Sequence, residues 1–278
     1  MTDVLGPGAD LASVVGEQPD PVLFATVSGA HLYGFPSRDS DVDLRGVHVL
    51  PTAALVGLGE PEETRSRMWF RDGTEMDLVT HDLRKFVRLM LRRNGYVLEQ
   101  LLSPLVVRTS DEHRELISLA PDVVTRHHAH HYRGFAATQW RLFEKSGELK
   151  PLLYTFRVLL TGIHLMRSGE VQADLPTLAG QIASPAYLAD LIAAKAEREH
   201  GPADIPRARV EEDVQRLHVL LDEAQEASEL PDAACAYDAL QAFVVRVRLD
   251  GFGGGQDVVP GAEGVPAGLP APGGVLER

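Results

Sequence analysis

The chain has 278 residues, of which 44% are hydrophobic and 24% are charged, so it can bury a sizeable core in one large or two small domains. Its formal net charge of −13 argues against indiscriminate nucleic-acid binding, which depends on many Lys and Arg side chains, although a local basic groove is compatible with it. The single cysteine excludes an internal disulfide framework, and no stretch approaches the roughly 18 apolar residues that a membrane span needs. Since the first residues also lack the basic region of a secretory signal, we expect a cytoplasmic protein.

Two segments near the amino terminus predict strands. Residues 22–29, VLFATVSG, are apolar and β-branched and end in glycine, which is typical of a buried strand that breaks into a turn. Residues 41–50, DVDLRGVHVL, alternate polar and apolar side chains, which predicts a second strand with Asp41 and Asp43 on one face. A third acid, Asp39, precedes this strand in the turn.

A hairpin is predicted over residues 67–82. The dipeptide Asp72-Gly73 is a strong turn signal between two arms of strand character. Alternation along the second arm places Glu75 and Asp77 on one face. The strand that carries Asp77 could lie alongside the strand that carries the first two acids.

Helical periodicity begins after the hairpin. Asp82 is a suitable N-cap for a helix that ends near Asn94-Gly95, and a second helix is expected over residues 97–102. Residues 113–226 are almost entirely helical in pattern, with breaks near Pro121, Gly147, Pro176, Pro185 and residues 201–206. The predicted fold class is therefore α+β, a small mixed β-sheet with flanking helices followed by a helical unit.

Three regions follow from this pattern. Residues 1–108 form the predicted catalytic core and residues 109–250 the helical domain. In residues 251–278 nearly half of the side chains are Gly or Pro, which predicts a flexible tail.

The spacing of the acids requires a physical explanation. Asp41 and Asp43 project from one face of a strand, where their charges repel unless something cationic lies between them. A hard divalent cation such as Mg²⁺ takes carboxylate oxygens and completes its shell with substrate phosphates. The alternative is a solvated strand edge with both acids in water, which is common for this spacing on protein surfaces. The glycine turn after the first strand favours the metal, because its backbone N–H groups can hold a phosphate.

These residues resemble a known family. Gly29-Ala30, a gap of ten residues, Asp41-Val42-Asp43 and an acid on a later strand are similar to the signature of the DNA polymerase β-like nucleotidyltransferases. Residues 28–47 and 82–104 are closest to the predicted nucleotidyltransferases of the bacterial and phage RNA-repair-associated group. The resemblance extends from about residue 22 to residue 104 and more weakly to residue 169.

The resemblance implies a reaction and its ligands. Asp41, Asp43 and Asp77 would hold two metal ions, Mg²⁺ or Mn²⁺, and Asp77 would accept the proton of the attacking hydroxyl. The protein would transfer a nucleoside monophosphate from a nucleoside triphosphate to an acceptor hydroxyl and release pyrophosphate. The group favours an RNA end as the acceptor.

The nucleotide would meet residues from three segments. Ser28, Gly29 and Ala30 form the glycine turn, where the family usually has Gly or Ser after the first glycine, so Ala30 removes one hydroxyl donor. Arg38 and Ser40 are candidates for phosphate contact, although Ser40 with Asp39 can instead close the turn. The third segment carries Lys150, Tyr154 and Arg157, which share one helix face and resemble a family set that grips the triphosphate; alternatively Tyr154 packs in the core while both cations are solvated.

Basic residues gather in two segments, 84–93 and 126–135, whereas the acidic excess lies mostly around residues 211–232. The second basic segment contains four histidines, His127, His128, His130 and His131. A zinc site on one helix face is sterically allowed. Because no cysteine or acid accompanies them, we interpret this segment as the edge of a phosphate-binding cleft.

Two other functions are compatible with the same residues. The acceptor could be a tyrosine or serine of a partner protein, as in toxin-neutralising nucleotidyltransferases. The chain could also be a non-catalytic nucleotide-binding module that keeps the fold, and Ala30 is the residue that favours this alternative.

Overall fold

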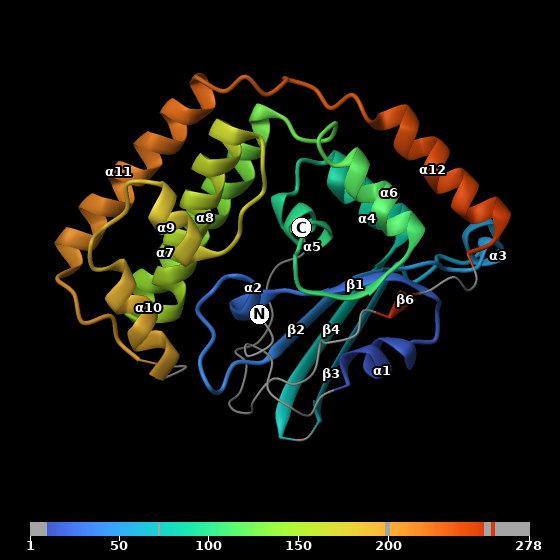
Figure 1. Ribbon diagram of the computed structural model, residues 1–278, viewed down its shortest axis with the longest axis horizontal. Coiled ribbons are helices and arrows are strands. Elements are labelled where there is room, and N and C mark those ends of the chain that lie inside the picture. Colours follow the sequence, from blue (N-terminus) through green and yellow to red (C-terminus); the bar gives the residue numbers. More distant parts are fainter. Residues whose placement is uncertain (1–9, 72, 198–200, 253–256, 259–278) are drawn as a thin grey trace.

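A mixed β-sheet lies at the centre of the computed structural model, which describes residues 10–71, 73–197, 201–252 and 257–258 (Figure 1). The strand order is β3-β4-β2-β1-β5-β6. The bounds of the strands are Val22–Val27 (β1), Val42–His48 (β2), Thr64–Arg71 (β3), Thr74–Asp82 (β4), Val106–Thr109 (β5) and Asp257–Val258 (β6).

One parallel pair sets the geometry of the sheet. Strands β2 and β4 run parallel, and every other neighbouring pair is antiparallel. Between β2 and β4 the chain forms the short helix α3 (Thr52–Val56) and the hairpin partner β3. The parallel register places Asp43 of β2 directly beside Asp77 of β4.

Each face of the sheet packs against its own group of helices. Helix α1 (Leu11–Gly16), capped by Asp10, covers one face, where its apolar side chains meet Leu44 and Leu78. The other face packs into a larger core with α4 (Leu83–Leu91), α5 (Gly95–Leu101) and α6 (Asp111–Leu119). The odd-numbered side chains at the start of β2, which include Asp43, therefore lie on the face opposite α1.

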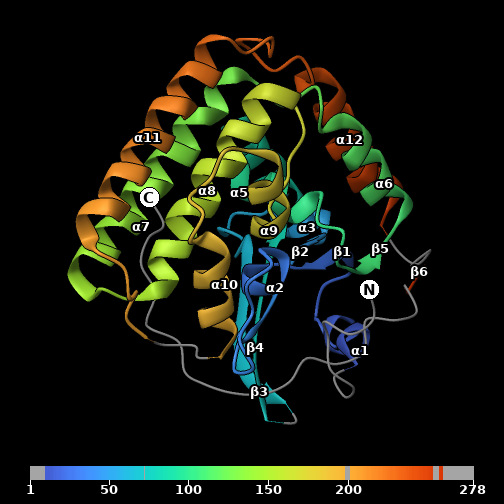
Figure 2. The ribbon, with the colours of Figure 1, turned by 60° about the vertical axis from the view of Figure 1, so that its left-hand side comes forward.

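The helical unit is built around one buried helix. In α8 (Leu149–Ser168) most side chains are buried, and this helix packs against α7 (Ala129–Ser146) and α11 (Arg207–Glu226) (Figure 2). The remaining elements are α2 (Gly29–Leu32), the 3₁₀ turn η1 (Arg126–His128), α9 (Leu175–Gln181), α10 (Leu188–Glu197) and α12 (Tyr237–Asp250). Helix α12 returns to pack on α4 and α6, so one hydrophobic core joins the sheet to the helical unit.

The structure confirms the α+β class and most predicted elements. Strands β1, β2 and the β3–β4 hairpin lie where the patterns place them, and Asp82 caps α4 by accepting a hydrogen bond from the backbone of Arg84. The structure adds β5, α2, α3 and the separate helix α12, for which no bounds were predicted. Most of the predicted tail, 251–278, lies outside the described residues. Within the described part of the chain, no helix is long and apolar enough to cross a membrane.

Candidate active site

Two parallel strands bring the predicted carboxylates together. Asp43 and Asp77 are register partners on β2 and β4, and Asp41 lies immediately before β2. Their side chains are only partly exposed, 16% for Asp43 and 19% for Asp77. The glycine turn packs directly on them, because a Cβ at Gly29 would lie 1.8 Å from Oδ2 of Asp43. Gly29 also has φ +61°, so glycine meets two requirements there at once.

Arg45 joins the two carboxylates. Its Nη2 donates to Oδ1 of Asp43 at 2.6 Å and to Oδ2 of Asp77 at 2.8 Å. Its Nη1 donates to the backbone carbonyls of Leu44 and Asp77, each at 2.9 Å, and its Nε donates to the hydroxyl of Tyr96 at 3.0 Å. The sequence interpretation assigned no chemistry to this arginine. The available signal was its position two residues after Asp43, which places both side chains on one face of the strand.

The carboxylate cluster has a high electrostatic cost. The pKa of Asp43 is raised to about 6, chiefly because the side chain is buried; Arg45 and Lys150 oppose this rise, and the charges of Asp41 and Asp77 add to it. Burial also raises the pKa of Tyr154, with Asp43 as the next cause. The charges of Lys150 and Asp43 and the hydroxyl of Tyr154 therefore interact between α8 and β2.

Arg157, the third predicted residue of α8, forms a buried ion pair with a different acid, Glu99. Its Nη1 donates to Oε1 of Glu99 at 2.7 Å, and both side chains are almost completely buried, with exposures of 0% and 1%. Its guanidinium lies 3.9 Å from the ring centroid of Tyr33, and Tyr33 in turn meets the ring of Tyr154 edge-on. A nucleotide could reach the Arg157 guanidinium only if this ion pair opened.

The other predicted nucleotide contacts lie in the two turns before β2. Ser28 is fully buried, and its Oγ has no hydrogen-bond partner among the described residues. Ala30 is buried, and Arg38 is exposed to solvent. Ser40 Oγ accepts from the backbone N–H of Ser37 at 2.9 Å, so this serine helps to close the turn.

The carboxylate oxygens at this site supply some, but not all, of the ligands that a hard divalent cation needs. Carboxylate oxygens are the ligands that Mg²⁺ prefers, and Mg²⁺ commonly takes only one or two of them together with substrate phosphates. Within the residues that the structure describes, no three His, Cys, Asp or Glu side chains converge closely enough to hold a metal ion. Asp41 and Asp43 can supply two ligands, although Arg45 engages one oxygen of Asp43 and one of Asp77.

The four histidines do not converge on one point. His128 is buried and its Nδ1 accepts from the backbone N–H of Thr125 at 3.1 Å, which stabilises the start of η1 and α7. His127 and His130 stack with ring centroids 5.8 Å apart. His131 turns its ring toward Tyr132.

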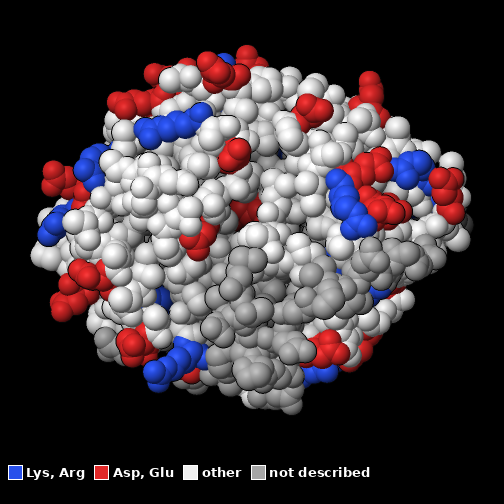
Figure 3. Space-filling model, viewed as in Figure 1, with Lys and Arg blue, Asp and Glu red and all other residues white. Residues whose placement is uncertain are grey.

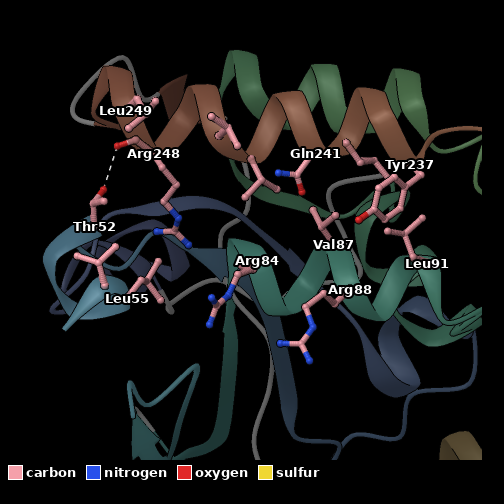
Figure 4. Close-up of a pocket in the computed structure, with 14 residues that line it drawn as sticks. Thr52, Leu55, Arg84, Val87, Arg88, Leu91, Tyr237, Gln241, Arg248 and Leu249 are labelled. Atoms are coloured by element: carbon pink, nitrogen blue, oxygen red, sulfur yellow. Dashed lines mark hydrogen bonds between the residues drawn. The ribbon is translucent and has the colours of Figure 1, made fainter. Parts of the chain in front are cut away.

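A separate groove lies between α4 and α12 (Figure 4). It has a cavity volume of about 540 Å³ and is mostly apolar, with three arginines at its margin. One of these, Arg248, reaches from α12 to the carboxylate of Asp82, and its backbone carbonyl accepts from Thr52 at 3.0 Å. None of its lining residues belongs to the carboxylate site, so we do not place the chemistry there.

Replacing Asp43 with Asn is expected to stabilise the metal-free protein at neutral pH. Because the fold raises the pKa of Asp43 from 3.8 to about 6, the folded state binds more protons than the unfolded state between these values. The native chain therefore loses stability as the pH rises through this window, by at most about 3 kcal/mol at 1.4 kcal/mol per pKa unit. Melting temperatures measured with a chelator should favour Asp43→Asn near neutral pH, and this advantage should disappear below about pH 4. An advantage that is independent of pH would contradict the assignment.

Comparison with known proteins gives two curated relatives. "Uncharacterized protein MJ0002" of Methanocaldococcus jannaschii is 33% identical over 158 residues, which cover 55% of this chain and 63% of the relative. "Uncharacterized protein YcgL" of Bacillus subtilis is 26% identical over 185 residues, which cover 56% of this chain and 68% of the relative. The chain thus spans less than two thirds of the first relative.

A solved nucleotidyltransferase-like protein from Exiguobacterium sibiricum is similar over 79% of this chain and 75% of that chain. Its sequence identity is 12% and its TM-score is 0.32, which is too low to establish a common fold. A match to a family model covers most of the chain, because residues 8–246 match the family described as "RlaP: RNA repair pathway DNA polymerase beta family". The chain belongs to this RNA repair pathway family of DNA polymerase β-like nucleotidyltransferases.

Proposed function

We propose that this protein is a metal-dependent nucleotidyltransferase that transfers a nucleoside monophosphate from a nucleoside triphosphate to the hydroxyl of an RNA end. The observation that carries the proposal is the pairing of Asp43 with Asp77 on parallel strands, against the tight turn at Gly29. Family membership supports the RNA acceptor.

The residues of the site divide between the two substrates. The backbone of the turn at Ser28, Gly29 and Ala30 would hold phosphate oxygens, with Lys150 adding positive charge and Tyr154 offering a ring edge. Asp41 and Asp43 would hold Mg²⁺ or Mn²⁺. Such an ion, when bound, stabilises the charge that develops on the entering and leaving oxygens.

The acceptor side depends on Asp77. Its carboxylate would accept the proton of the acceptor hydroxyl as that oxygen bonds to the α-phosphorus. The bond from the α-phosphorus to the bridging oxygen breaks, and pyrophosphate leaves with its electron pair. Arg45 would hold Asp43 and Asp77 in register, so that both substrates meet between them.

The test is transfer of label from each of the four α-³²P nucleoside triphosphates to total RNA and to total protein, with Mg²⁺ or Mn²⁺. We expect labelled RNA with the native chain and none with Asp77→Asn, which is isosteric but a much weaker base. Label in a protein band would instead identify a protein-modifying enzyme. A correctly folded native chain that labels nothing would favour the non-catalytic module, which Ala30 would suit because it lacks the hydroxyl of the family residue.

A further inference from the structure

A groove with a cavity volume of about 790 Å³ opens beside the carboxylate site. Its walls come from β4, the carboxyl end of α4, the start of α5 and the start of α7. The side chains that matter for its chemistry are Lys85, Arg92, Arg93, Tyr96, His127 and His130.

A hydrogen bond links the groove to the proposed reaction centre. Tyr96 lines it and accepts a hydrogen bond at 3.0 Å from Arg45, the residue that holds both carboxylates. His81 also lines it and lies four residues after Asp77 on the same face of β4. At about 3.3 Å per residue, the groove therefore reaches β4 at a point about 13 Å along the strand from Asp77.

The charge of the groove is opposite to that of the whole chain. Among the described residues that line it there is no Asp or Glu, although the formal net charge of the chain is −13. Acidic side chains gather instead over α11, along the upper left rim in Figure 3. On the α7 side, Asp232 pairs with Arg126 at 3.1 Å and approaches His127 at 3.6 Å.

Three cations supply the positive charge. Lys85 donates to the hydroxyl of Thr64, whereas Arg92 and Arg93 are exposed and form no ion pair with any carboxylate in the described part of the chain. Burial, with Arg157 and His128 as further causes, lowers the pKa of His131 to about 4, so this imidazole is neutral at physiological pH. The groove is therefore cationic through Lys85 and the two arginines.

Arg93 is held in an unusual backbone conformation. It follows the C-cap of α4 with φ +61°, a position where glycine or asparagine is usual. A residue with a Cβ is strained in this conformation. An arginine that lowers stability at the rim of a groove is better explained by binding than by folding.

We infer that this groove binds the sugar-phosphate backbone of a single-stranded nucleic-acid acceptor, with the terminal hydroxyl at Asp77. This inference rests on the proposed function and specifies where its acceptor lies. Lys85, Arg92 and Arg93 neutralise phosphates, and the rings of Tyr96, His127 and His130 offer faces on which unpaired bases can stack. Such stacking surfaces favour a nucleic acid over an acidic peptide.

The test measures binding of a fluorescent single-stranded RNA of about 12 nucleotides to the full chain without nucleotide, over a salt series. The groove variant is Arg92→Ala with Arg93→Gly. The matched control is Arg88→Ala with Arg141→Ala, which also removes two exposed arginines from α4 and α7 but leaves this groove intact. An acidic peptide serves as a competitor.

Each phosphate contact contributes about 0.7 to the salt exponent for a single strand, which is about fivefold in affinity at 0.1 M salt. We expect the groove variant to bind about 25-fold more weakly with an exponent lower by about 1.4, and the control to bind like the native chain. Because Arg93→Gly removes the backbone strain of a left-handed residue with a Cβ, the melting temperature of the variant should not fall. Equal affinity of native and groove variant, or competition by the peptide as effective as by unlabelled RNA, would overturn the inference.

The same experiment separates this inference from the proposed function. Asp77→Asn should bind the RNA at least as tightly as the native chain while transferring no label. If the native chain binds RNA in the groove but transfers no label, RNA binding in the groove is supported and the proposed transferase activity is contradicted. If the native chain transfers label and the groove variant binds RNA with native affinity, the proposed transferase activity is supported and RNA binding in the groove is contradicted.

Discussion

Replacing both Asp41 and Asp43 with Asn is expected to lower nucleotidyl transfer by at least about 100-fold while the fold is retained. Loss of a single preorganised electrostatic contact in an active site commonly costs about 10² to 10³ in rate. Two carboxylates are removed here, together with the metal binding that we propose for them. The measurement is the initial rate of label transfer at saturating nucleotide and RNA, with a thermal melt to confirm folding.

The neighbouring acid Asp39 provides the control. It lies in the turn two residues before Asp41, where its backbone N–H donates to Ser37 Oγ at 3.4 Å. Asp39→Asn removes one negative charge from the same surface, against two in the double variant, but removes no proposed ligand. We expect its transfer rate to stay within about twofold of native, since surface substitutions away from special contacts have small effects. An equal loss in both variants would show that the local charge alone matters.

Local patterns predicted the strands and their faces. Alternation over residues 41–50 placed Asp41 and Asp43 on one face, and the Asp72-Gly73 dipeptide predicted the hairpin that carries Asp77. Both signals depend on near neighbours in the chain. The parallel register of β2 with β4, which brings Asp43 beside Asp77, is a long-range pairing that the sequence indicated only as an arrangement that could occur.

Short or locally ambiguous elements were not predicted. Strand β5 has four residues, which is too few for a periodic signal, and its pairings with β1 and β6 define it. The left-handed conformation of Arg93 also gives no sequence signal, because an arginine there contradicts the usual preference for glycine.

The remaining differences between the sequence prediction and the structure at the site involve long side chains. The role of Arg45 depends on how far a guanidinium reaches across a strand, which strand periodicity does not describe. Spacing placed Arg157 on one face with Lys150 and Tyr154, but α8 is buried on nearly all sides, so a shared face does not mean a shared solvent cleft. The partner of Arg157 is Glu99, 58 residues earlier in the chain, and its burial was not predicted.

Arg157→Met is expected to lower the free energy of unfolding by about 3–5 kcal/mol. The substitution leaves Glu99 buried without its partner, and breaking one side of a buried ion pair typically costs this much. For a protein of this size 1 kcal/mol corresponds to about 2–4 °C, so the melting temperature should fall by about 10 °C. Thermal and urea unfolding followed by circular dichroism measure the loss.

Two further variants test the cause of this loss. Arg157→Met with Glu99→Leu removes both charges and should recover most of the stability, since a buried ion pair is often replaceable by apolar side chains. Arg167→Met, at an exposed position on the same helix, should change stability by no more than about 0.5 kcal/mol. In contrast, an Arg157→Met chain that melts like the native protein but needs several-fold more nucleoside triphosphate to reach half-maximal transfer would place Arg157 on the triphosphate, as the sequence predicted.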